Sequence, residues 1–279
     1  MHQAKKIVAR NGFADVVTCV RGKMETLLEE GGLPLARGET VDVVVSEWMG
    51  YALFFETMLP SVLAARDALV APGTGTMFPN VSAIFLEGAD ASGQWNYWND
   101  VHSIDMTPMK ARLASEVTRE ASVELVPEEN IVTERVKLIE HDLNACRDAE
   151  LDFAVPFELR LRDSAATTTG ATVELHQLVV SFDIRFAVPG TREVSFSTGC
   201  QGPATHWKQT VLWCDPVHGD CPRLNGAAGE SLRGTFHMRR GTPNHRDIDM
   251  AVVWETGKGD DDGGWTKTGE GVLKRSLIA

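Results

Sequence analysis

The sequence predicts an α/β segment followed by an antiparallel β domain, and three observations support this fold class. Residues 1–79 alternate helical and strand-like patterns, which is typical of part of a Rossmann-type sheet. From about Val81, short β-branched runs recur with turn residues between them, as in an antiparallel sandwich or barrel. Residues 91–113 interrupt these runs with a helical, aromatic-rich sequence. We therefore expect part of a Rossmann-type domain over residues 1–79, an antiparallel β-barrel over 80–255 with a helical arm at 91–113, and a tail at 256–279.

The N-terminal segment contains helix and strand patterns in alternation. A helix is expected to end at Arg10, because Asn11-Gly12 can adopt the left-handed conformation that stops helices. The β-branched run Val16–Val20 predicts a strand, and Val41–Val45 predicts another that is buried on both faces, as in a parallel sheet. One face of a further helix is formed by Leu59, Val62, Leu63 and Leu69.

The β domain is predicted from recurrent strand-like runs. They are Val81–Leu86, Ile131–Ile139, Leu151–Leu161, Thr172–Val188, Glu193–Ser197, Gln209–Trp213, Ser231–His237 and Asp247–Glu255. The segment Gly93–Leu113 lacks strand alternation, and its exposed aromatic residues are expected to be covered by another surface. From Gly257 a Gly/Asp-rich sequence predicts a mobile tail.

Composition and charge narrow the possible partners and locations. Lys and Arg number 27 and Asp and Glu 39, so the net charge is −12. This balance disfavours direct nucleic-acid binding; it either attracts basic partners or simply keeps the protein soluble. No apolar run reaches the roughly 20 residues of a membrane span, and the N-terminus lacks the apolar core of a secretory signal. The five scattered cysteines resemble reduced thiols, so we expect a protein of the cytoplasm or nucleus without a membrane partner.

The most informative stretch for chemistry is Ser46–Met58. Glu47 follows a predicted strand, where α/β sheets place their ligands. Gly50 permits a tight bend, so that Glu56 can return towards Glu47 among large apolar residues. Carboxylates among apolar side chains are costly without a cationic partner, and a planar guanidinium with paired donors suits two of them.

Other interpretations of the two acids stay open on spacing alone. They fit unrelated surface acids, which is the default for an arbitrary pair, or a glycosidase acid/base pair. A hard metal ion would require more oxygen ligands than two acids supply. Elsewhere, Cys214, His218 and Cys221 have the spacing of half a zinc site, but no second Cys/His pair follows, so we expect a turn and no metal.

Two strings together resemble the protein arginine methyltransferase family. Ser46–Tyr51 with Phe55–Met58 is similar to that family's double-Glu loop, and Thr205–Val211 is similar to its Thr-His-Trp loop. The resemblance runs loosely from residue 1 to about 255. Trp98–Val101 and the Phe before Glu56 look nearest to the arginine methyltransferase 3 branch.

The resemblance implies roles for individual residues. Glu47 and Glu56 would clamp the substrate guanidinium. His206 would help to carry away the proton, unless it is a structural histidine bonded across the domain junction, and Trp207 would form a wall of the arginine channel. Finally, Met49 and Met58 match positions at which the members that form asymmetric dimethylarginine, the type I class, carry Met.

The resemblance also implies the cofactor S-adenosyl-L-methionine. Lys23, Met24 and Glu25 match the segment that contacts adenine, with Glu25 accepting from its amine. The family's other cofactor contacts lie on a first strand and a Gly-rich loop upstream of residue 1. We therefore expect an N-terminally truncated chain that binds the cofactor weakly by itself. The alternative is a non-catalytic partner or scaffold subunit.

The implied partners are basic proteins and a second copy of the chain. Substrates would be arginine-containing, often Gly/Arg-rich, with histones and ribosomal proteins as candidates. In this family the arm docks on a partner's cofactor domain, which implies a homodimer through residues 91–113.

Overall fold

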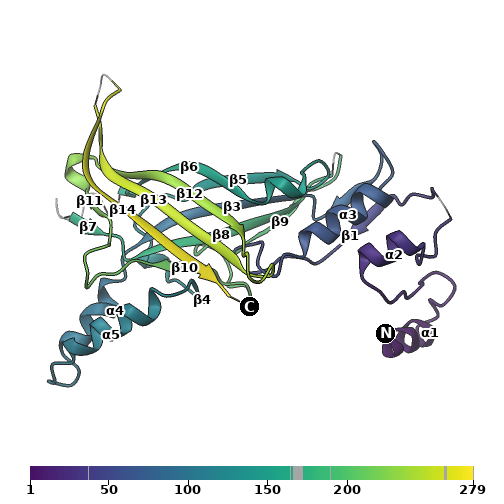
Figure 1. Ribbon diagram of the computed structural model, residues 1–279, viewed down its shortest axis with the longest axis horizontal. Helices are drawn as coiled ribbons and strands as arrows, with labels where there is room; N and C mark the ends of the chain where they lie inside the picture. Colours follow the sequence, from purple (N-terminus) through teal and green to yellow (C-terminus); the bar gives the residue numbers. More distant parts are fainter. Residues whose placement is uncertain (37, 164, 166–171, 189, 261–262, 279) are drawn as a thin grey trace.

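The computed structural model of the chain describes residues 1–36, 38–163, 165, 172–188, 190–260 and 263–278. The molecule is elongated, with the α/β segment at one end, the helical arm at the other and the β-sheets between them (Figure 1). Among the described residues, no helix is long and apolar enough to cross a lipid bilayer.

The N-terminal segment contains short helices and a small parallel sheet. Its elements are α1 (His2–Arg10), α2 (Met24–Glu30), β1 (Val43–Val45), α3 (Leu59–Leu69) and β2 (Thr76–Phe78). Helix α1 ends where predicted, and Gly12 has a left-handed φ of 74°. Strand β1 pairs in parallel with β2, so the predicted alternation of helix and strand is confirmed in this part.

Two predictions for this segment are wrong. Val16–Val20 is irregular and mostly exposed, because a β-branched run forms a strand only where a neighbouring strand supplies hydrogen bonds, and the described chain places none beside it. Strand β1 forms, but Val45 is 75% exposed instead of buried. In the described part of the chain, β1 belongs to a sheet of two strands, and so small a sheet leaves Val45 exposed.

The β domain is built from two larger antiparallel sheets. The first runs in the order β4 (Ser122–Glu124), β10 (Gln209–Trp213), β8 (Gln177–Phe186), β3 (Val81–Ala89) and β5 (Val136–Asp142), with β9 (Val194–Ser197) also pairing with β8. The second runs β14 (Trp265–Leu277), β13 (Ile248–Gly259), β12 (Ser231–Arg240) and β6 (Phe153–Arg160). A small pair joins β7 (Thr172–Glu174) to β11 (Arg223–Asn225), and short turns are η2 (Glu128–Asn130), η3 (Asp148–Glu150) and η4 (Gly226–Ala228). Every strand-like run predicted for the β domain contains all or part of a strand.

The two large sheets share one apolar core. It includes Ile84, Phe182, Phe236 and Val252. A few backbone hydrogen bonds link the sheet edges. Ala121 N–H donates to the Ser276 carbonyl at 2.9 Å, and at the other edge Glu134 N–H donates to the Arg160 carbonyl and Arg162 N–H to the Val132 carbonyl, both at 2.9 Å. The described ladders therefore remain separate sheets and do not close into a continuous barrel.

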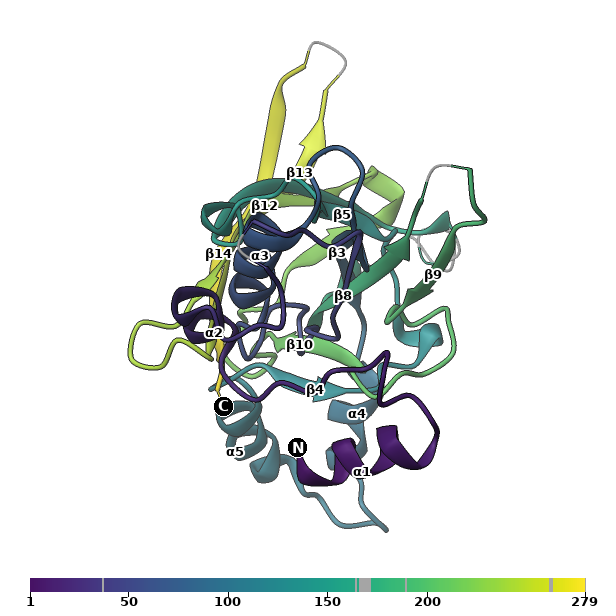
Figure 2. The ribbon, with the colours of Figure 1, turned by 90° about the vertical axis from the view of Figure 1, so that its right-hand side faces the viewer.

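Helix α3 joins the two parts of the molecule. It lies over the end of the sheets when the molecule is viewed along its long axis (Figure 2). The buried guanidinium of Arg66 donates to the carbonyls of Leu143 and Cys146 at 2.8 and 2.7 Å. These bonds fix the α/β segment against the β domain.

The prediction of a mobile tail is wrong. Strand β14 pairs with β13 along its length, from Ile248 opposite Leu277 to Gly259 opposite Trp265. Gly257–Gly259, where the Gly/Asp-rich sequence begins, are the last residues of β13, and residues 261–262 lie outside the described part of the chain. Beyond them, β14 buries Leu273 and Leu277 in the core, and this apolar burial holds it in place.

The helical arm forms as predicted, but its aromatic residues divide into two groups. It comprises α4 (Ser92–Asn96), η1 (Tyr97–Asn99) and α5 (Thr107–Val117). Trp95 is buried and meets Trp213 of β10 edge to face, with ring centroids 5.8 Å apart. Tyr97 and Ile104 are 55 and 61% exposed. Trp95 therefore anchors the arm, and its outer part offers apolar surface to a partner.

Candidate active site

The double-Glu loop follows β1 and folds back on itself at Gly50. Gly50 and Leu53 exchange backbone hydrogen bonds of 2.9 and 3.1 Å. A Cβ atom at residue 50 would lie 1.9 Å from the Phe55 carbonyl oxygen, so only glycine fits there. Gly50 thus permits the tight bend that the sequence predicted.

Several residues of this loop have strained backbones. Ala52, Leu53, Glu56 and Thr57 have φ values of 47, 72, 72 and 49°. Left-handed φ at non-glycine residues costs about 1 kcal/mol or more each and persists only where the surroundings enforce it. Such strain is common at functional sites.

Both candidate acids are exposed, so the expectation that large apolar residues surround them is wrong: Trp48, Phe54 and Phe55 are buried in the core instead. The two acids also differ in their partners. The Glu47 carboxylate has no hydrogen-bond or ion-pair partner among the described residues. The Glu56 carboxylate accepts a hydrogen bond from Arg246 Nη2 at 2.6 Å. Trp48, between them in sequence, is buried and stacks on Phe54 with centroids 6.2 Å apart.

The Thr-His-Trp loop contacts the double-Glu loop directly. Trp207 Nε1 donates to the Met49 carbonyl at 2.9 Å, across a sequence separation of 158 residues. The Trp207 ring stacks on Phe196 at 5.3 Å, and the exposed His206 ring lies 3.8 Å from it. The structure therefore brings together the two strings that the sequence singled out.

The two methionines have different environments. Met49 is half-buried and packs against the main core. Met58 is the N-cap residue of α3 and is 50% exposed. The methionine at 49 is thus the one held close to Trp207.

The predicted cofactor segment begins helix α2. Lys23 is its N-cap residue, and Met24 and Glu25 lie in its first turn. The Glu25 carboxylate accepts a hydrogen bond from the Ser61 hydroxyl of α3, and this bond lowers the pKa of Glu25. An ionised, exposed carboxylate can exchange a hydroxyl donor for an adenine amine. The assignment of these residues to the adenine end of S-adenosylmethionine stays a prediction.

The Cys214–Cys221 segment is a turn, as predicted. The Asp215 carboxylate accepts from the backbone N–H groups of Val217 and His218 at 2.9 and 3.0 Å, and it contacts His218 Nδ1 at 2.7 Å. A hydrogen bond with Cys214 and burial raise the pKa of the Cys221 thiol. The described residues contain no group of His, Cys, Asp and Glu arranged to hold a metal.

The sequence analysis missed Arg246, which pairs with Glu56. It lies in the turn between β12 and β13, 190 residues away. A basic residue in a polar turn has no periodicity or motif that would link it to so distant an acid.

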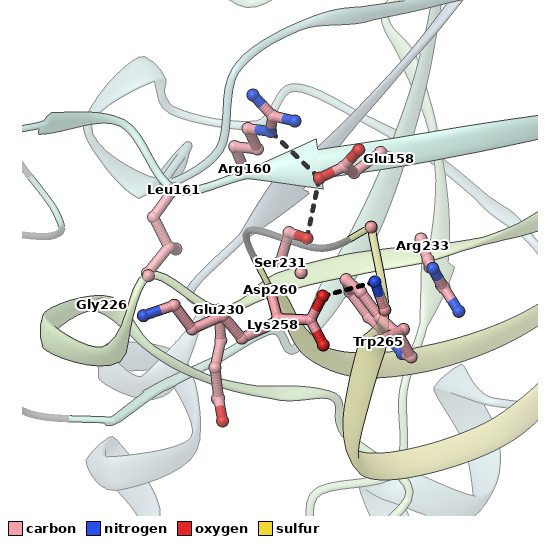
Figure 3. A pocket seen from close by; sticks show the side chains of 14 residues that line it. Glu158, Arg160, Leu161, Gly226, Glu230, Ser231, Arg233, Lys258, Asp260 and Trp265 are labelled. Carbon is pink, nitrogen blue, oxygen red and sulfur yellow. Dashed lines mark hydrogen bonds and ion pairs between the residues drawn. The ribbon is translucent and has the colours of Figure 1, made fainter.

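A separate cavity of about 570 Å³ lies against strands β6, β12, β13 and β14 (Figure 3). Two of its arginines contact other lining residues: Arg160 pairs with Glu158 at 3.0 Å, and the Arg233 guanidinium lies 3.7 Å from the centre of the Trp265 ring. None of the predicted site residues lines it.

The fold and the two joined loops point to a class of protein, the methyltransferases that modify arginine side chains. A family model described as the arginine methyltransferase oligomerization subdomain matches residues 80–259. Protein arginine N-methyltransferase 1 of Saccharomyces cerevisiae is 35% identical over 260 residues, covering 91% of this chain and 67% of the relative. Protein arginine N-methyltransferase 1.1 of Arabidopsis thaliana is 36% identical, covering 90% of this chain and 58% of the relative. The chain belongs to the protein arginine N-methyltransferase family.

Solved structures agree with this assignment. A chain of the Trypanosoma brucei PRMT1 enzyme–prozyme heterotetrameric complex with AdoHcy superimposes with a TM-score of 0.72 at 30% identity, covering 98% of this chain and 78% of that one. Arabidopsis thaliana protein arginine methyltransferase 10 superimposes with a TM-score of 0.75 at 21% identity, covering 99% of this chain and 80% of that one. This match shows similarity of fold. The arginine methyltransferase 3 branch stays a prediction, because the yeast and Arabidopsis relatives of 35 and 36% identity are named arginine N-methyltransferase 1 and 1.1.

Proposed function

We propose that Glu47 and Glu56 bind the guanidinium of a protein arginine while a methyl group from S-adenosylmethionine is transferred to it. The observation that carries the proposal is the hydrogen bond from Trp207 to the Met49 carbonyl. This bond holds the Thr-His-Trp loop against the loop that bears both acids. An arginine entering beside Trp207 would therefore arrive next to two carboxylates on a rigid, strained backbone.

The chemistry assigned to these residues is electrostatic and positional. S-adenosylmethionine, when bound, supplies a methyl group on a positively charged sulfur. Two carboxylates offset the repulsion between that charge and the guanidinium, and they orient one guanidinium nitrogen for in-line attack. They keep positive charge on the nitrogen that they bind, so the other nitrogen is the better nucleophile. His206, exposed beside Trp207, accepts the proton released when the new N–C bond forms.

The product is assigned as mono- and then asymmetric dimethylarginine. Met49 and Met58 provide flexible thioether side chains, which leave room for a second methyl on the same nitrogen. Met49 lies nearer to the Trp207 contact, so we assign it the larger part in product choice.

The proposed substrates are basic, Gly/Arg-rich proteins of the cytoplasm or nucleus. A net charge of −12 attracts such partners over distances comparable with the Debye length. The proposed assembly is a homodimer in which the outer part of the arm, with Tyr97 and Ile104, docks on the α/β segment of a second copy.

Transfer of a labelled methyl group tests the proposal. The purified protein is incubated with methyl-labelled S-adenosylmethionine and a Gly/Arg-rich peptide, or with the same peptide carrying Lys for every Arg. Label is expected in the Arg peptide alone, as asymmetric dimethylarginine after hydrolysis. Protein that binds the cofactor and the peptide but labels neither peptide would support the non-catalytic alternative instead.

A further inference from the structure

The turn between β12 and β13 is bound to the double-Glu loop at three points. Glu56 N–H donates to the Arg246 carbonyl at 2.9 Å, and Thr57 Oγ1 donates to the His245 carbonyl at 2.8 Å. The third contact is between side chains, from Arg246 Nη2 to Glu56 Oε1 at 2.6 Å. The same short segment therefore holds both the backbone and the carboxylate of Glu56.

The position of Arg246 is fixed by the hairpin itself. Gly241 N–H donates to the Asp247 carbonyl at 2.8 Å, and Asp247 N–H donates to the Asn244 carbonyl at 3.0 Å. Asn244 Oδ1 also accepts from Arg246 N–H at 3.2 Å. These bonds fix the backbone of Arg246 beside Glu56.

Folding stability does not explain this ion pair. The Arg246 and Glu56 side chains are 50 and 47% exposed, and exposed ion pairs contribute little to stability because water screens them. The pair does constrain one of the two acids of the proposed clamp. Glu47 has no such partner among the described residues, so the two acids are not equivalent.

We propose that Arg246 is a positioning residue for Glu56. It holds one carboxylate oxygen, so that the other oxygen is left to the substrate guanidinium in a fixed orientation. Glu56 then makes a one-oxygen contact, while Glu47, with both oxygens free, makes the bidentate one. This inference rests on the proposed function of the two acids.

Kinetics of Arg246 variants test the inference. Arg246→Gln is expected to lower kcat/KM about tenfold, in the range of one charge-assisted hydrogen bond. The melting temperature and the affinity for S-adenosylmethionine are expected to stay near wild type. Arg246→Lys keeps the charge and should recover part of the loss.

The control Arg239→Gln removes an exposed arginine of the same hairpin, paired with Asp249 at 3.5 Å, and should behave as wild type. If Arg246→Gln lowers the melting temperature, the test compares kcat/KM of Arg246→Lys with that of Arg239→Lys instead.

A double-mutant cycle with Glu56→Gln separates this inference from the clamp itself. If Arg246 acts through Glu56, adding Arg246→Gln to Glu56→Gln lowers kcat/KM no further. Independent, multiplying losses would overturn the positioning role, as would wild-type kinetics of Arg246→Gln beside a defective Glu56→Gln. Wild-type kinetics of Glu56→Gln would instead overturn the clamp, and the positioning role with it.

Discussion

Gly50 decides the shape of the loop that carries both acids. Its lack of a side chain lets the Phe55 carbonyl approach, and this approach closes the bend between Glu47 and Glu56. The strained φ angles at Glu56 and Thr57 follow from the same bend and from the bonds to the β12–β13 turn. Single residues therefore set the geometry that the guanidinium would meet.

Substitution of Gly50 by Ala should disrupt this loop. The new Cβ would lie 1.9 Å from the Phe55 oxygen, so the loop must shift, and overpacking of this kind costs about 1–3 kcal/mol. We expect a lower melting temperature and a large loss of turnover. Gly259→Ala at the end of β13 is the matched control, because its added Cβ would meet nothing nearer than the Gly264 carbonyl oxygen at 4.0 Å. Equal melting temperatures and turnover for both variants would contradict the role given to Gly50.

At the scale of elements, the arm combines an anchor with an exposed surface. Trp95 is held in the small core around Trp213, whereas Tyr97 and Ile104 face solvent in this chain. Large apolar residues at an exposed tip commonly mark an interface. A deletion of residues 91–113 would also remove Trp95, so point substitutions separate docking from folding better.

Tyr97→Asp together with Ile104→Asp should weaken self-association. Each side chain would bury apolar area worth roughly 1.5–3 kcal/mol, so losing both should raise the dimer dissociation constant at least about a hundredfold. Light scattering at a series of concentrations measures this change, and methylation activity should fall with it. Val272→Asp adds a charge at another exposed apolar position and should leave association unchanged. A double variant as dimeric as wild type would refute the arm interface.

Strand and helix patterns in the sequence predicted much of the fold. They failed where the outcome depended on whether a neighbouring strand was present to pair with. β10 occupies the predicted run Gln209–Trp213, because its sequence matches a strand with neighbours on both sides. Val16–Val20 has the same propensity without a neighbour and stays irregular. For β14, the glycines and aspartates of its connecting loop concealed a strand that β13 pairs with throughout.

The candidate site was likewise predicted only in part. Motif strings identified Glu47, Glu56, His206 and Trp207, and the contact of Trp207 with Met49 joins the two loops that carry them. Arg246 could not be predicted, since its relation to Glu56 exists only after β12, β13 and the α/β segment have come together.

At the scale of the whole molecule, the site forms where the two parts of the chain meet. The acids come from the α/β segment, while His206, Trp207 and Arg246 come from the β domain. Arg66 and the β12–β13 turn hold these parts together through backbone carbonyls. The geometry of the proposed guanidinium site therefore depends on this junction.

Turnover of Glu47→Gln and Glu56→Gln tests the guanidinium clamp most directly. Gln keeps the size of Glu but removes a charge-assisted contact worth roughly 1.5–3 kcal/mol, so each variant should lose at least about tenfold in kcat. Cofactor affinity by calorimetry and the melting temperature should stay near wild type, and the double variant should be little worse than the worse single one. Stable variants that bind S-adenosylmethionine and methylate at the wild-type rate would contradict the clamp.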